Sequence, residues 1–329
     1  MKIAVVGATG LIGSKITEVL TERKFPVTEF IPVTNDTSPE EHICFDNKIC
    51  RVRTLEECIE EKPSIALFSA GTIVSLEWAP KFAKAGITVI DKSSIWRMHG
   101  KVPLVVPEVN AHAIKEGSRI IASPNCSVIQ LAMVLAPLHY KYKINRIVIS
   151  TYQSVTGTGL KSIQQLKNER NGITGDMAYP YPIDLNIIPH GGIFLHTGCT
   201  TEEIKLVDET RKVFDDESIQ ITATVVRIPV FGGNSESVNV EFEENFDMEN
   251  IRLILSESPG ILLQDDILNC VYPMPLYAQG KNEIFVGRLR RDDTRHNAVN
   301  MWIVTDCLRK GAATNIVQIA EYIVEKKYV

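Results

Sequence analysis

The N-terminal segment "KIAVVGATGLIG" constrains the fold more than any other part of the chain. An apolar run leads into glycines at positions 7, 10 and 13, and apolar residues at helical spacing follow. In a strand–turn–helix unit, such glycines let the backbone approach a pyrophosphate, which the free N–H groups at the start of the helix hold. A merely structural tight turn is the alternative. Because the glycines directly follow a strand and open a helix, we predict a dinucleotide-binding domain.

The spacing of apolar residues divides the chain into two parts. Up to about position 123, short apolar runs alternate with helical stretches, which is typical of a doubly wound parallel α/β sheet of the Rossmann type. Strands are expected there at 2–7, 27–33, 65–70, 88–91 and 104–109, and one more strand in "RIIASPNCS" runs into a helix that starts around Cys126. Beyond position 124, longer strands with period-two alternation predict an α+β domain, whose mixed or antiparallel sheet has one face covered by helices. These strands are expected at 145–155, 220–230, 237–244, 283–291 and 297–306.

Two further segments have a clear character. Residues 171–198 contain three prolines and show no period, which is typical of a loop that is functional or contacts a partner subunit. Residues 308–326 have the spacing of an amphipathic helix.

Length, charge and cysteine content exclude several classes of protein. A chain of 329 residues suggests two domains. The net charge of −5 argues against binding to nucleic acid or a membrane surface, and no apolar run is long enough to span a bilayer. The N-terminus lacks the pattern of a signal peptide. The seven cysteines are odd in number and form no C-x-x-C pair, so we expect no disulfide framework, no metal site and a cytoplasmic location.

The segment "SPNCSVIQ" places Cys126 after a proline and in the first turn of a predicted helix. A helix N-terminus favours the thiolate, which is the reactive form of cysteine. A buried cysteine that only packs is the alternative. Together with a nucleotide domain upstream, a reactive thiol suggests an aldehyde dehydrogenase or an acyl-phosphate reductase, in which a thioester forms and hydride is exchanged with nicotinamide.

A series of motifs then points to one family. They include "VVGATGLIG", "LFSAG", "SPNCS", "STYQSVTGTG", "PYPIDLNIIPH", "TTEEIKLVDET", "RIPVFGGNSESVNVEF" and "WIVTDCLRKGAATNIVQIAE". With these motifs in this order, the chain resembles the aspartate-semialdehyde dehydrogenase family over essentially its whole length. The resemblance implies the reduction of aspartyl phosphate to aspartate semialdehyde with NADPH and the release of phosphate. The product would feed the synthesis of lysine, threonine, methionine and diaminopimelate.

The resemblance also implies how the chain is organised. Residues 1–123 and 309–329 would bind the dinucleotide, because the last helix returns to the first domain. Residues 124–308 would form a domain for catalysis and dimerisation. Members of the family are built as homodimers, often paired into homotetramers.

Individual roles follow from the same resemblance. Cys126 would be the nucleophile, Gln153 would orient the thioester, and Arg227 would bind the substrate carboxylate, which a bidentate guanidinium suits better than a lysine. Phosphate would be bound by Arg97 and Lys205, for which solvated surface charges are the alternative. The full set of expected substrate residues is Arg97, Asn125, Glu202, Lys205 and Arg227. The expected cofactor contacts are Gly7, Thr9, Gly10, Leu11, Ile12, Ser69, Gly71 and Asn315.

The match fails at one catalytic position. The family motif "RxPVxxGHSE" has a histidine where this chain has Asn234. That histidine exchanges protons with the oxygen of the tetrahedral intermediate. Asparagine forms hydrogen bonds but takes up no proton at neutral pH, and losing such a group costs roughly 10²–10⁴ in rate. Two explanations are open: an engineered His-to-Asn variant made to trap a complex, or a natural chain that uses water as the proton carrier.

Two departures affect the cofactor and the phosphate. After the second strand the chain has Asp36, Glu40 and Glu41 and no basic residue, so NAD is an alternative to NADP. Lys92 replaces the asparagine of the family's "DNSS", and its extra charge near Arg97 either supports or disturbs phosphate binding.

Two other functions remain as alternatives. N-acetyl-glutamyl-phosphate reductase shares the fold and the thiol chemistry, although "STYQ" and "EEIK" favour aspartate-semialdehyde dehydrogenase. A pseudoenzyme that binds nucleotide fits Asn234, but the presence of Cys126, Gln153, Arg227 and Lys205 argues against it.

Overall fold

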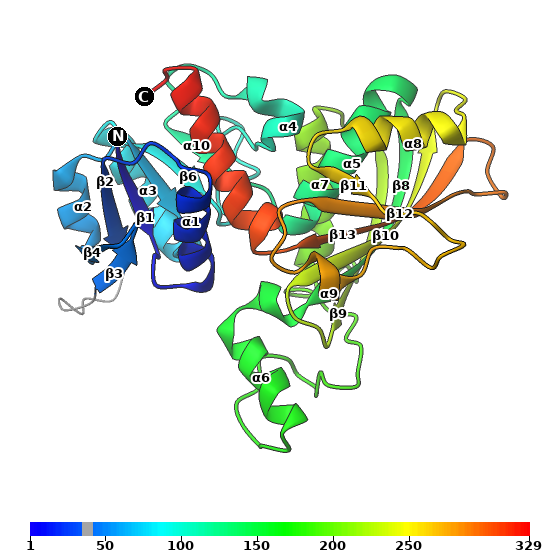
Figure 1. Ribbon diagram of the computed structural model, residues 1–329, viewed down its shortest axis with the longest axis horizontal. Coiled ribbons are helices and arrows are strands. Elements are labelled where there is room, and N and C mark those ends of the chain that lie inside the picture. The colour runs from blue at the N-terminus through cyan, green and yellow to red at the C-terminus, as the bar shows by residue number, and fades with distance from the viewer. Residues whose placement is uncertain (35–41) are drawn as a thin grey trace. The chain divides into compact units, whose positions relative to one another are not determined.

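The computed structural model describes residues 1–34 and 42–329. The chain forms two compact units (Figure 1), unit 1 with Met1–Asn125 and Ala312–Val329, and unit 2 with Cys126–Gly311. Within the described residues, no helix has the length and apolar character needed to cross a bilayer.

Unit 1 is built on a parallel five-stranded sheet with the order β2-β1-β5-β6-β7. Every pair of neighbouring strands in it is parallel. This confirms the expected doubly wound sheet. Its strands are β1 (Lys2–Val6), β2 (Glu29–Val33), β5 (Ile65–Phe68), β6 (Thr88–Asp91) and β7 (Ile120–Ala122).

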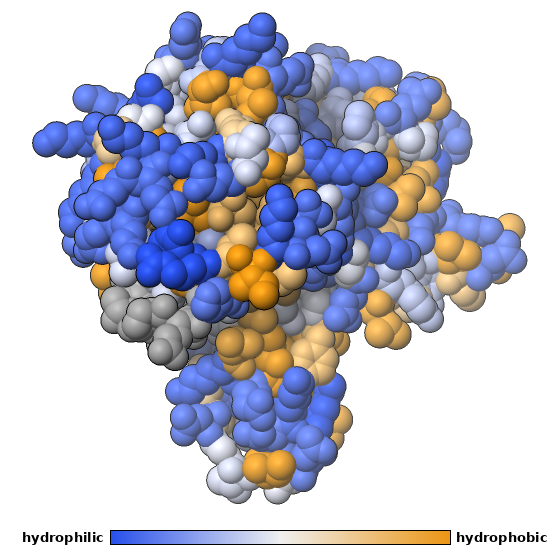
Figure 2. Space-filling view, turned by 60° about the vertical axis from the view of Figure 1, so that its left-hand side comes forward, coloured by the Kyte–Doolittle hydropathy of each residue, from blue (hydrophilic) through white to orange (hydrophobic). Residues whose placement is uncertain are grey.

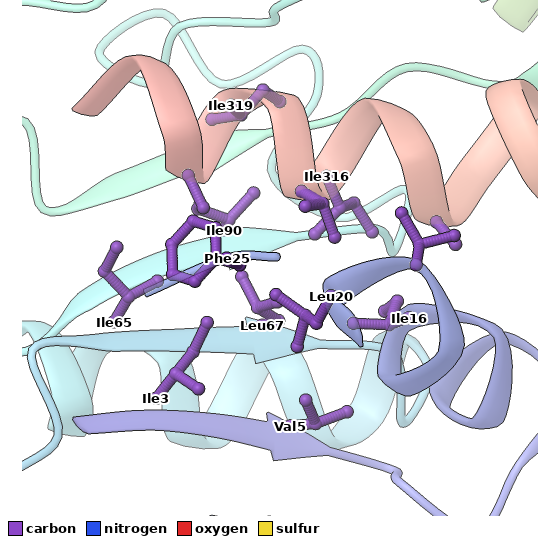
Figure 3. Close-up of a cluster of buried hydrophobic side chains, with 14 of the residues drawn as sticks. Ile3, Val5, Ile16, Leu20, Phe25, Ile65, Leu67, Ile90, Ile316 and Ile319 are labelled. Atoms are coloured by element: carbon purple, nitrogen blue, oxygen red, sulfur yellow. The ribbon is translucent and has the colours of Figure 1, made fainter. Parts of the chain in front are cut away.

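Helices cover both faces of this sheet, as near-continuous apolar strands require. Helices α1 (Leu11–Glu22) and α10 (Asn315–Glu325) pack on the face formed by the odd-numbered residues of β1, where their leucine and isoleucine side chains meet those of the strands (Figure 3). Helices α2 (Leu55–Glu61) and α3 (Thr72–Lys84) pack on the opposite face. The apolar side of α10 therefore completes the core of unit 1.

A hairpin in unit 1 was not anticipated from the sequence. Strands β3 (His42–Phe45) and β4 (Lys48–Arg51) pair antiparallel across a two-residue turn. The turn residues, Asp46 and Asn47, both have positive φ. This is the conformation of a type I′ turn, which asparagine and aspartate tolerate better than most residues.

The prediction of a strand at 104–109 is wrong. Leu104 makes only an isolated parallel bridge to β7. A short helix, α4 (Pro107–Asn110), then begins at the proline, and a 3₁₀ turn, η1 (Ala111–Ala113), follows. Proline has no N–H for a strand ladder but suits the first turn of a helix, so the apolar run ends as a helix start.

Unit 2 is built on a mixed six-stranded sheet with the order β11-β12-β13-β10-β8-β9. The pairs β8–β9 and β11–β12 are parallel, and the other three pairs are antiparallel. The expected mixed sheet is confirmed, with β11 as an additional strand. The strands are β8 (Ile144–Ser154), β9 (Gln220–Ile228), β10 (Gly233–Phe242), β11 (Ile261–Leu263), β12 (Ile284–Arg291) and β13 (Ala298–Asp306).

The helices of unit 2 fall into two groups. Helices α5 (Cys126–Tyr142), α7 (Thr201–Phe214) and α8 (Met248–Glu257) pack together, and each also contacts the sheet. Helix α6 (Leu160–Arg170) follows a 3₁₀ turn, and with the predicted loop 171–198 it encloses a small apolar cluster of its own. The remaining short elements are η2 (Val155–Thr158) and α9 (Pro275–Ala278).

The C-terminal helix begins later than its apolar spacing predicts. Residues Arg309–Thr314 form a π-helical turn, η3, and α10 starts only at Asn315. A Cβ atom at Gly311 in this turn would lie 2.8 Å from Cβ of Cys126. The glycine therefore lets the turn pass close to the predicted nucleophile.

Candidate active site

Cys126 and Asn234 lie in direct contact in unit 2. Cys126 is the first residue of α5, as the sequence predicts, and it is partly exposed. Asn234 lies near the start of β10 and is 1% exposed. The Nδ2 group of Asn234 donates to Sγ of Cys126 over 3.4 Å. The residue that departs from the family motif therefore contacts the predicted nucleophile itself.

Ser154 determines which way the Asn234 amide points. The backbone N–H of Ser154, the last residue of β8, donates to Oδ1 of Asn234 over 2.9 Å. Because an N–H must be paired with the amide oxygen, the NH₂ group faces the sulfur. This group stabilises a thiolate by donating to it, but it accepts no proton.

Gln153 is held beside the predicted nucleophile through Ser127. Gln153 is 2% exposed, and its Nε2 donates to Oγ of Ser127 over 3.3 Å. Ser127 follows Cys126 in the first turn of α5. In the parallel ladder between β8 and β9, Gln153 is also the partner of Arg227, so these two expected site residues are neighbours on the sheet.

Arg227 provides a positive charge in an enclosed position. It is 8% exposed, and its backbone pairs with Ile188 of the loop 171–198. Among the described residues, no carboxylate forms an ion pair with its guanidinium. Gly157 lies next to it, because a Cβ atom there would be 3.8 Å from Nη1 of Arg227. A nearly buried guanidinium without a protein carboxylate suits the binding of an anionic ligand.

Glu202 and Lys205 form an ion pair in the first turn of α7. This turn is held by a capping box, in which Thr200 and Glu203 each bond the other's backbone N–H. Oε1 of Glu203 also accepts from the backbone N–H of Val225 in β9. The start of α7 is thus tied to the strand that carries Arg227, and Lys205 is part of a defined pair.

Cys126 is partly exposed, whereas Cys58 and Cys307 are buried. Burial raises the pKa of the Cys58 thiol to about 12 and also raises the pKa of Cys307. The Cys307 sulfur lies 3.7 Å from Oγ of Ser154. Both thiols stay protonated at neutral pH, which makes them poor nucleophiles.

The glycine turn of unit 1 has the geometry of a dinucleotide site. Gly7 has φ +85°, and a Cβ atom there would lie 2.9 Å from the Ala70 nitrogen. A Cβ atom at Gly13 would lie 2.0 Å from the Gly7 oxygen, so only glycine lets α1 pack this closely. Gly10 caps α1 without a side chain. Bare backbone at a helix start fits a pyrophosphate, so the residues present suit the expected nucleotide.

Most of the other expected cofactor residues lie at the same edge of the sheet. Thr9, Leu11 and Ile12 belong to the turn after β1 and the start of α1. Ser69 and Gly71 follow β5, and Oγ of Ser69 donates to the Val6 carbonyl over 2.9 Å. A cavity of about 470 Å³ lies beside the turn, between α1 and β3. In parallel α/β sheets, ligands bind at the carboxyl ends of the strands, which is where these residues lie.

Asn315 is fully buried at the start of α10. Its Nδ2 donates to the Val105 carbonyl and to Oγ of Ser123, each over 3.0 Å. These hydrogen bonds hold α10 within unit 1. The expected contact of Asn315 with nicotinamide stays a prediction.

Arg97 and Lys92 follow β6 and are both engaged with backbone carbonyls. Arg97 is 6% exposed, and its Nη2 donates to the Lys92 carbonyl over 2.8 Å. Nζ of Lys92 donates to the carbonyl of Pro124 over 2.6 Å. The ammonium group of Lys92 is thus directed to the segment that precedes Asn125, which is itself 8% exposed. Arg97 is too buried to be an ordinary surface charge.

The choice between NAD and NADP was argued from three acidic residues after the second strand. These residues lie outside the described part of the chain: Asp36, Glu40 and Glu41.

Comparison with known proteins decides the family. Two family models match the chain: the NAD binding domain of semialdehyde dehydrogenases over residues 2–117 and their dimerisation domain over residues 135–310. The aspartate-semialdehyde dehydrogenase of Aquifex aeolicus is 46% identical, over 99% of this chain and 98% of that protein. The chain belongs to the aspartate-semialdehyde dehydrogenase family. Enzymes of this family are NAD(P)-dependent phosphorylating dehydrogenases of amino-acid biosynthesis.

Solved structures of the family agree with this assignment. Aspartate-semialdehyde dehydrogenase II from Vibrio cholerae is 42% identical, with a TM-score of 0.94 over 98% of both chains. A structure of the same enzyme complexed with ASA gives the same TM-score at 41% identity. These matches do not favour N-acetyl-glutamyl-phosphate reductase or a pseudoenzyme.

Three residues of the site were not singled out from the sequence. Ser127 links Gln153 to the first turn of α5, Ser154 orients Asn234, and Gly311 leaves room beside Cys126. Ser127 and Ser154 each follow a predicted site residue directly, which is the one signal that marks them in the sequence. The role of Gly311 depends on a tertiary approach and has no local signal.

Proposed function

We propose that this chain reduces aspartyl phosphate to aspartate semialdehyde through a thioester on Cys126. The sulfur of Cys126 attacks the acyl carbon, and the bond from that carbon to the phosphate oxygen breaks, so that phosphate leaves with the bonding electrons. A nicotinamide nucleotide bound at the glycine turn would supply the hydride that converts the Cys126 thioester to the thiohemiacetal. Loss of the sulfur then releases the aldehyde and restores the thiolate.

The residues of unit 2 support this chemistry. Arg227 binds the substrate carboxylate, because its guanidinium is nearly buried and has no described carboxylate partner. Gln153, its neighbour across the β8–β9 ladder, orients the thioester. Glu202, Lys205, Arg97 and Asn125 are the further substrate residues of the proposal, with Lys205 and Arg97 binding the phosphate.

The contact between Asn234 and Cys126 is the observation that carries the proposal. A side-chain NH₂ group aimed at a helix-N-terminal sulfur stabilises the thiolate in the resting enzyme. Asn234 accepts no proton, so the acid–base step on the substrate oxygen falls to water. We therefore propose that the chain has the family activity at a lowered rate.

NADP is the proposed cofactor, with NAD as the alternative. The turn with Gly7, Gly10 and Gly13 suits the pyrophosphate that both share. The proposal is tested by measuring the phosphate-dependent oxidation of aspartate semialdehyde with each nucleotide. Activity with either one supports the function, and the ratio of the two kcat/KM values gives the preference. An inert protein with both nucleotides, which also stays inert after Asn234→His, would exclude the proposed function.

We also propose a cytoplasmic homodimer or homotetramer that assembles through unit 2. The dimerisation model matches this unit. Large apolar side chains are exposed on α6 and the loop after it, where hydrophobic patches interrupt the hydrophilic surface of the projecting lobe (Figure 2). They include Leu160, Ile173, Tyr181, Leu185, Ile187, Ile193 and Phe194. Exposed apolar residues of this extent suit a subunit interface.

A further inference from the structure

The end of the loop 171–198 pairs with the start of α7. The backbone N–H of Thr201 donates to the Ile193 carbonyl over 2.9 Å, and that of Glu202 donates to the Gly191 carbonyl over 3.3 Å. In return, the backbone N–H of Ile193 donates to Oγ1 of Thr201 over 3.1 Å. The loop thus supplies acceptors for two of the N–H groups that a helix start leaves without an intrahelical partner.

Two adjacent glycines make this close packing possible. A Cβ atom at Gly191 would lie 2.6 Å from Cγ1 of Val225 in β9 and 3.0 Å from Cβ of Glu202. Gly192 has φ +81°, and a Cβ atom there would lie 2.1 Å from Oγ1 of Thr201. Because such distances are too short for non-bonded atoms, a side chain at either position would push the loop away from the first turn of α7.

The same part of the loop also contacts the strand that carries Arg227. Ile188 and Arg227 exchange two backbone hydrogen bonds, of 3.0 and 2.8 Å. The segment 188–194 therefore pairs with β9 at one end and with the start of α7 at the other. It fixes where the first turn of α7, with Lys205, lies relative to Arg227.

The ion pair of Glu202 and Lys205 depends on this backbone support. Both side chains are partly exposed, and they lie three residues apart on one face of α7. A partly exposed ion pair contributes little to holding its own geometry. The position of Glu202, whose backbone N–H bonds to the Gly191 carbonyl, is instead determined by the loop. Through the ion pair, the loop also determines where the ammonium group of Lys205 lies.

We infer that Gly191 and Gly192 are positioning residues, which hold Glu202 and Lys205 in place by letting the loop pair with the first turn of α7. This inference rests on the proposed binding of phosphate by Lys205. An ammonium group is a point charge on a flexible stem, so its contact with phosphate depends on where its helix turn lies. A misplacement of about 1 Å in such a group costs up to about 10² in rate.

Gly192→Ala and Gly198→Ala form a matched pair of variants. Both glycines belong to the loop 171–198 and have nearly the same φ, +81° and +85°, so alanine strains the backbone equally at the two positions. At Gly192 the added Cβ meets Thr201, whereas at Gly198 it meets no described atom within 4 Å. For each protein, kcat, the melting temperature and the KM values for phosphate and aspartate semialdehyde are measured.

We expect Gly192→Ala to raise the KM for phosphate at least about tenfold and to change the KM for aspartate semialdehyde less than about threefold. Gly198→Ala should keep both KM values within about twofold of the parent. Both variants should lower the melting temperature, because alanine is strained at a positive φ. The comparison thereby separates the contact with α7 from backbone strain.

Thr201→Val tests the hydrogen bond between the loop and α7 without adding an atom, and it decides the question if Gly192→Ala fails to fold. Valine keeps the branched shape of threonine but removes the acceptor of the Ile193 N–H. The KM for phosphate should rise about fivefold, the usual effect of one hydrogen bond. Thr201→Ser keeps the hydroxyl group and should stay within about twofold of the parent.

The inference would be overturned if Gly192→Ala and Gly198→Ala had the same KM for phosphate, or if Thr201→Val and Thr201→Ser did. A rise of equal size in both KM values would also overturn it, because general distortion of the site produces that result.

If no protein in the series oxidises aspartate semialdehyde, the proposed function fails. The inference is then tested without turnover, by the rise in melting temperature that inorganic phosphate causes relative to sodium chloride of equal ionic strength. A rise in the parent and in Gly198→Ala that is lost in Gly192→Ala supports the inference. An equal rise in all three proteins, or no rise in the parent, overturns it.

Discussion

The amide of Asn234 is held between two groups with opposite demands. Its oxygen accepts from the backbone N–H of Ser154 over 2.9 Å, and its nitrogen donates to the sulfur of Cys126 over 3.4 Å. If the amide of Asn234 flipped, the backbone N–H of Ser154 would face an NH₂ group and would lose its acceptor. Asn234 is thereby fixed as a hydrogen-bond donor to Cys126, the proposed nucleophile, a role that supports thiolate formation but not proton transfer.

Asn234→His should restore the missing acid–base group. We expect kcat for the phosphate-dependent oxidation of aspartate semialdehyde to rise about 10²–10⁴-fold, the usual contribution of a positioned acid–base residue. Asn239→His is the control, since Asn239 lies on the outer face of the same strand and bonds Asp292 and Asn300. An unchanged kcat in Asn234→His would show that proton transfer at this position does not limit the reaction.

Arg227→Lys should weaken substrate binding. A lysine keeps the charge but loses the bidentate geometry with a carboxylate, so we expect kcat/KM for aspartate semialdehyde to fall about 10–100-fold. Arg146→Lys, on the same sheet but partly exposed, should change kcat/KM less than about twofold. Steady-state kinetics at several substrate concentrations separates KM from kcat. If the two lysine variants had the same kcat/KM, Arg227 would be excluded as a residue that binds the substrate.

Cys126 should react with iodoacetamide well ahead of the other six cysteines. The position at the start of α5 and the Asn234 donor both favour its thiolate. Burial raises the pKa of Cys58 to about 12 and also raises that of Cys307, so these two should be the slowest. Peptide mass spectrometry after timed labelling at pH 7 gives the order. Labelling of Cys44 or Cys270, which are exposed, at the same rate as Cys126 would contradict an activated thiol.

Gly7→Ala should impair nucleotide binding. Gly7 has φ +85°, which is strained for alanine by about 1 kcal/mol, and the added Cβ would lie 2.9 Å from the Ala70 nitrogen. We expect at least tenfold weaker binding of NADP and NAD by calorimetry. Gly100→Ala, where the added atom meets nothing within 4 Å, is the control for the substitution itself. Unchanged affinity in Gly7→Ala would place the nucleotide elsewhere.

Much of the fold could be predicted because its signals are local. Except for the short β11, the strands of both sheets follow from apolar runs of period one or two, and α5 follows from its helical spacing after Pro124. The errors arise where one residue overrides the pattern. Pro107 turned an expected strand into a helix start, and Gly311 lies in a π-helical turn where a continuous helix was expected. The hairpin at Asp46 and Asn47 had a signal, the turn dipeptide, that was not recognised.

By itself, the sequence determined the family and the parallel sheet with its glycine turn, and it predicted which cysteine is the nucleophile, because each depends on residues that are adjacent or regularly spaced. Only the tertiary structure decided how these residues act together. Gln153 and Arg227 become neighbours through the register of β8 and β9, and Asn234 faces Cys126 because Ser154 orients its amide. Such contacts join segments far apart in the chain, and their geometry follows from strand register and hydrogen-bond direction, which no local pattern specifies.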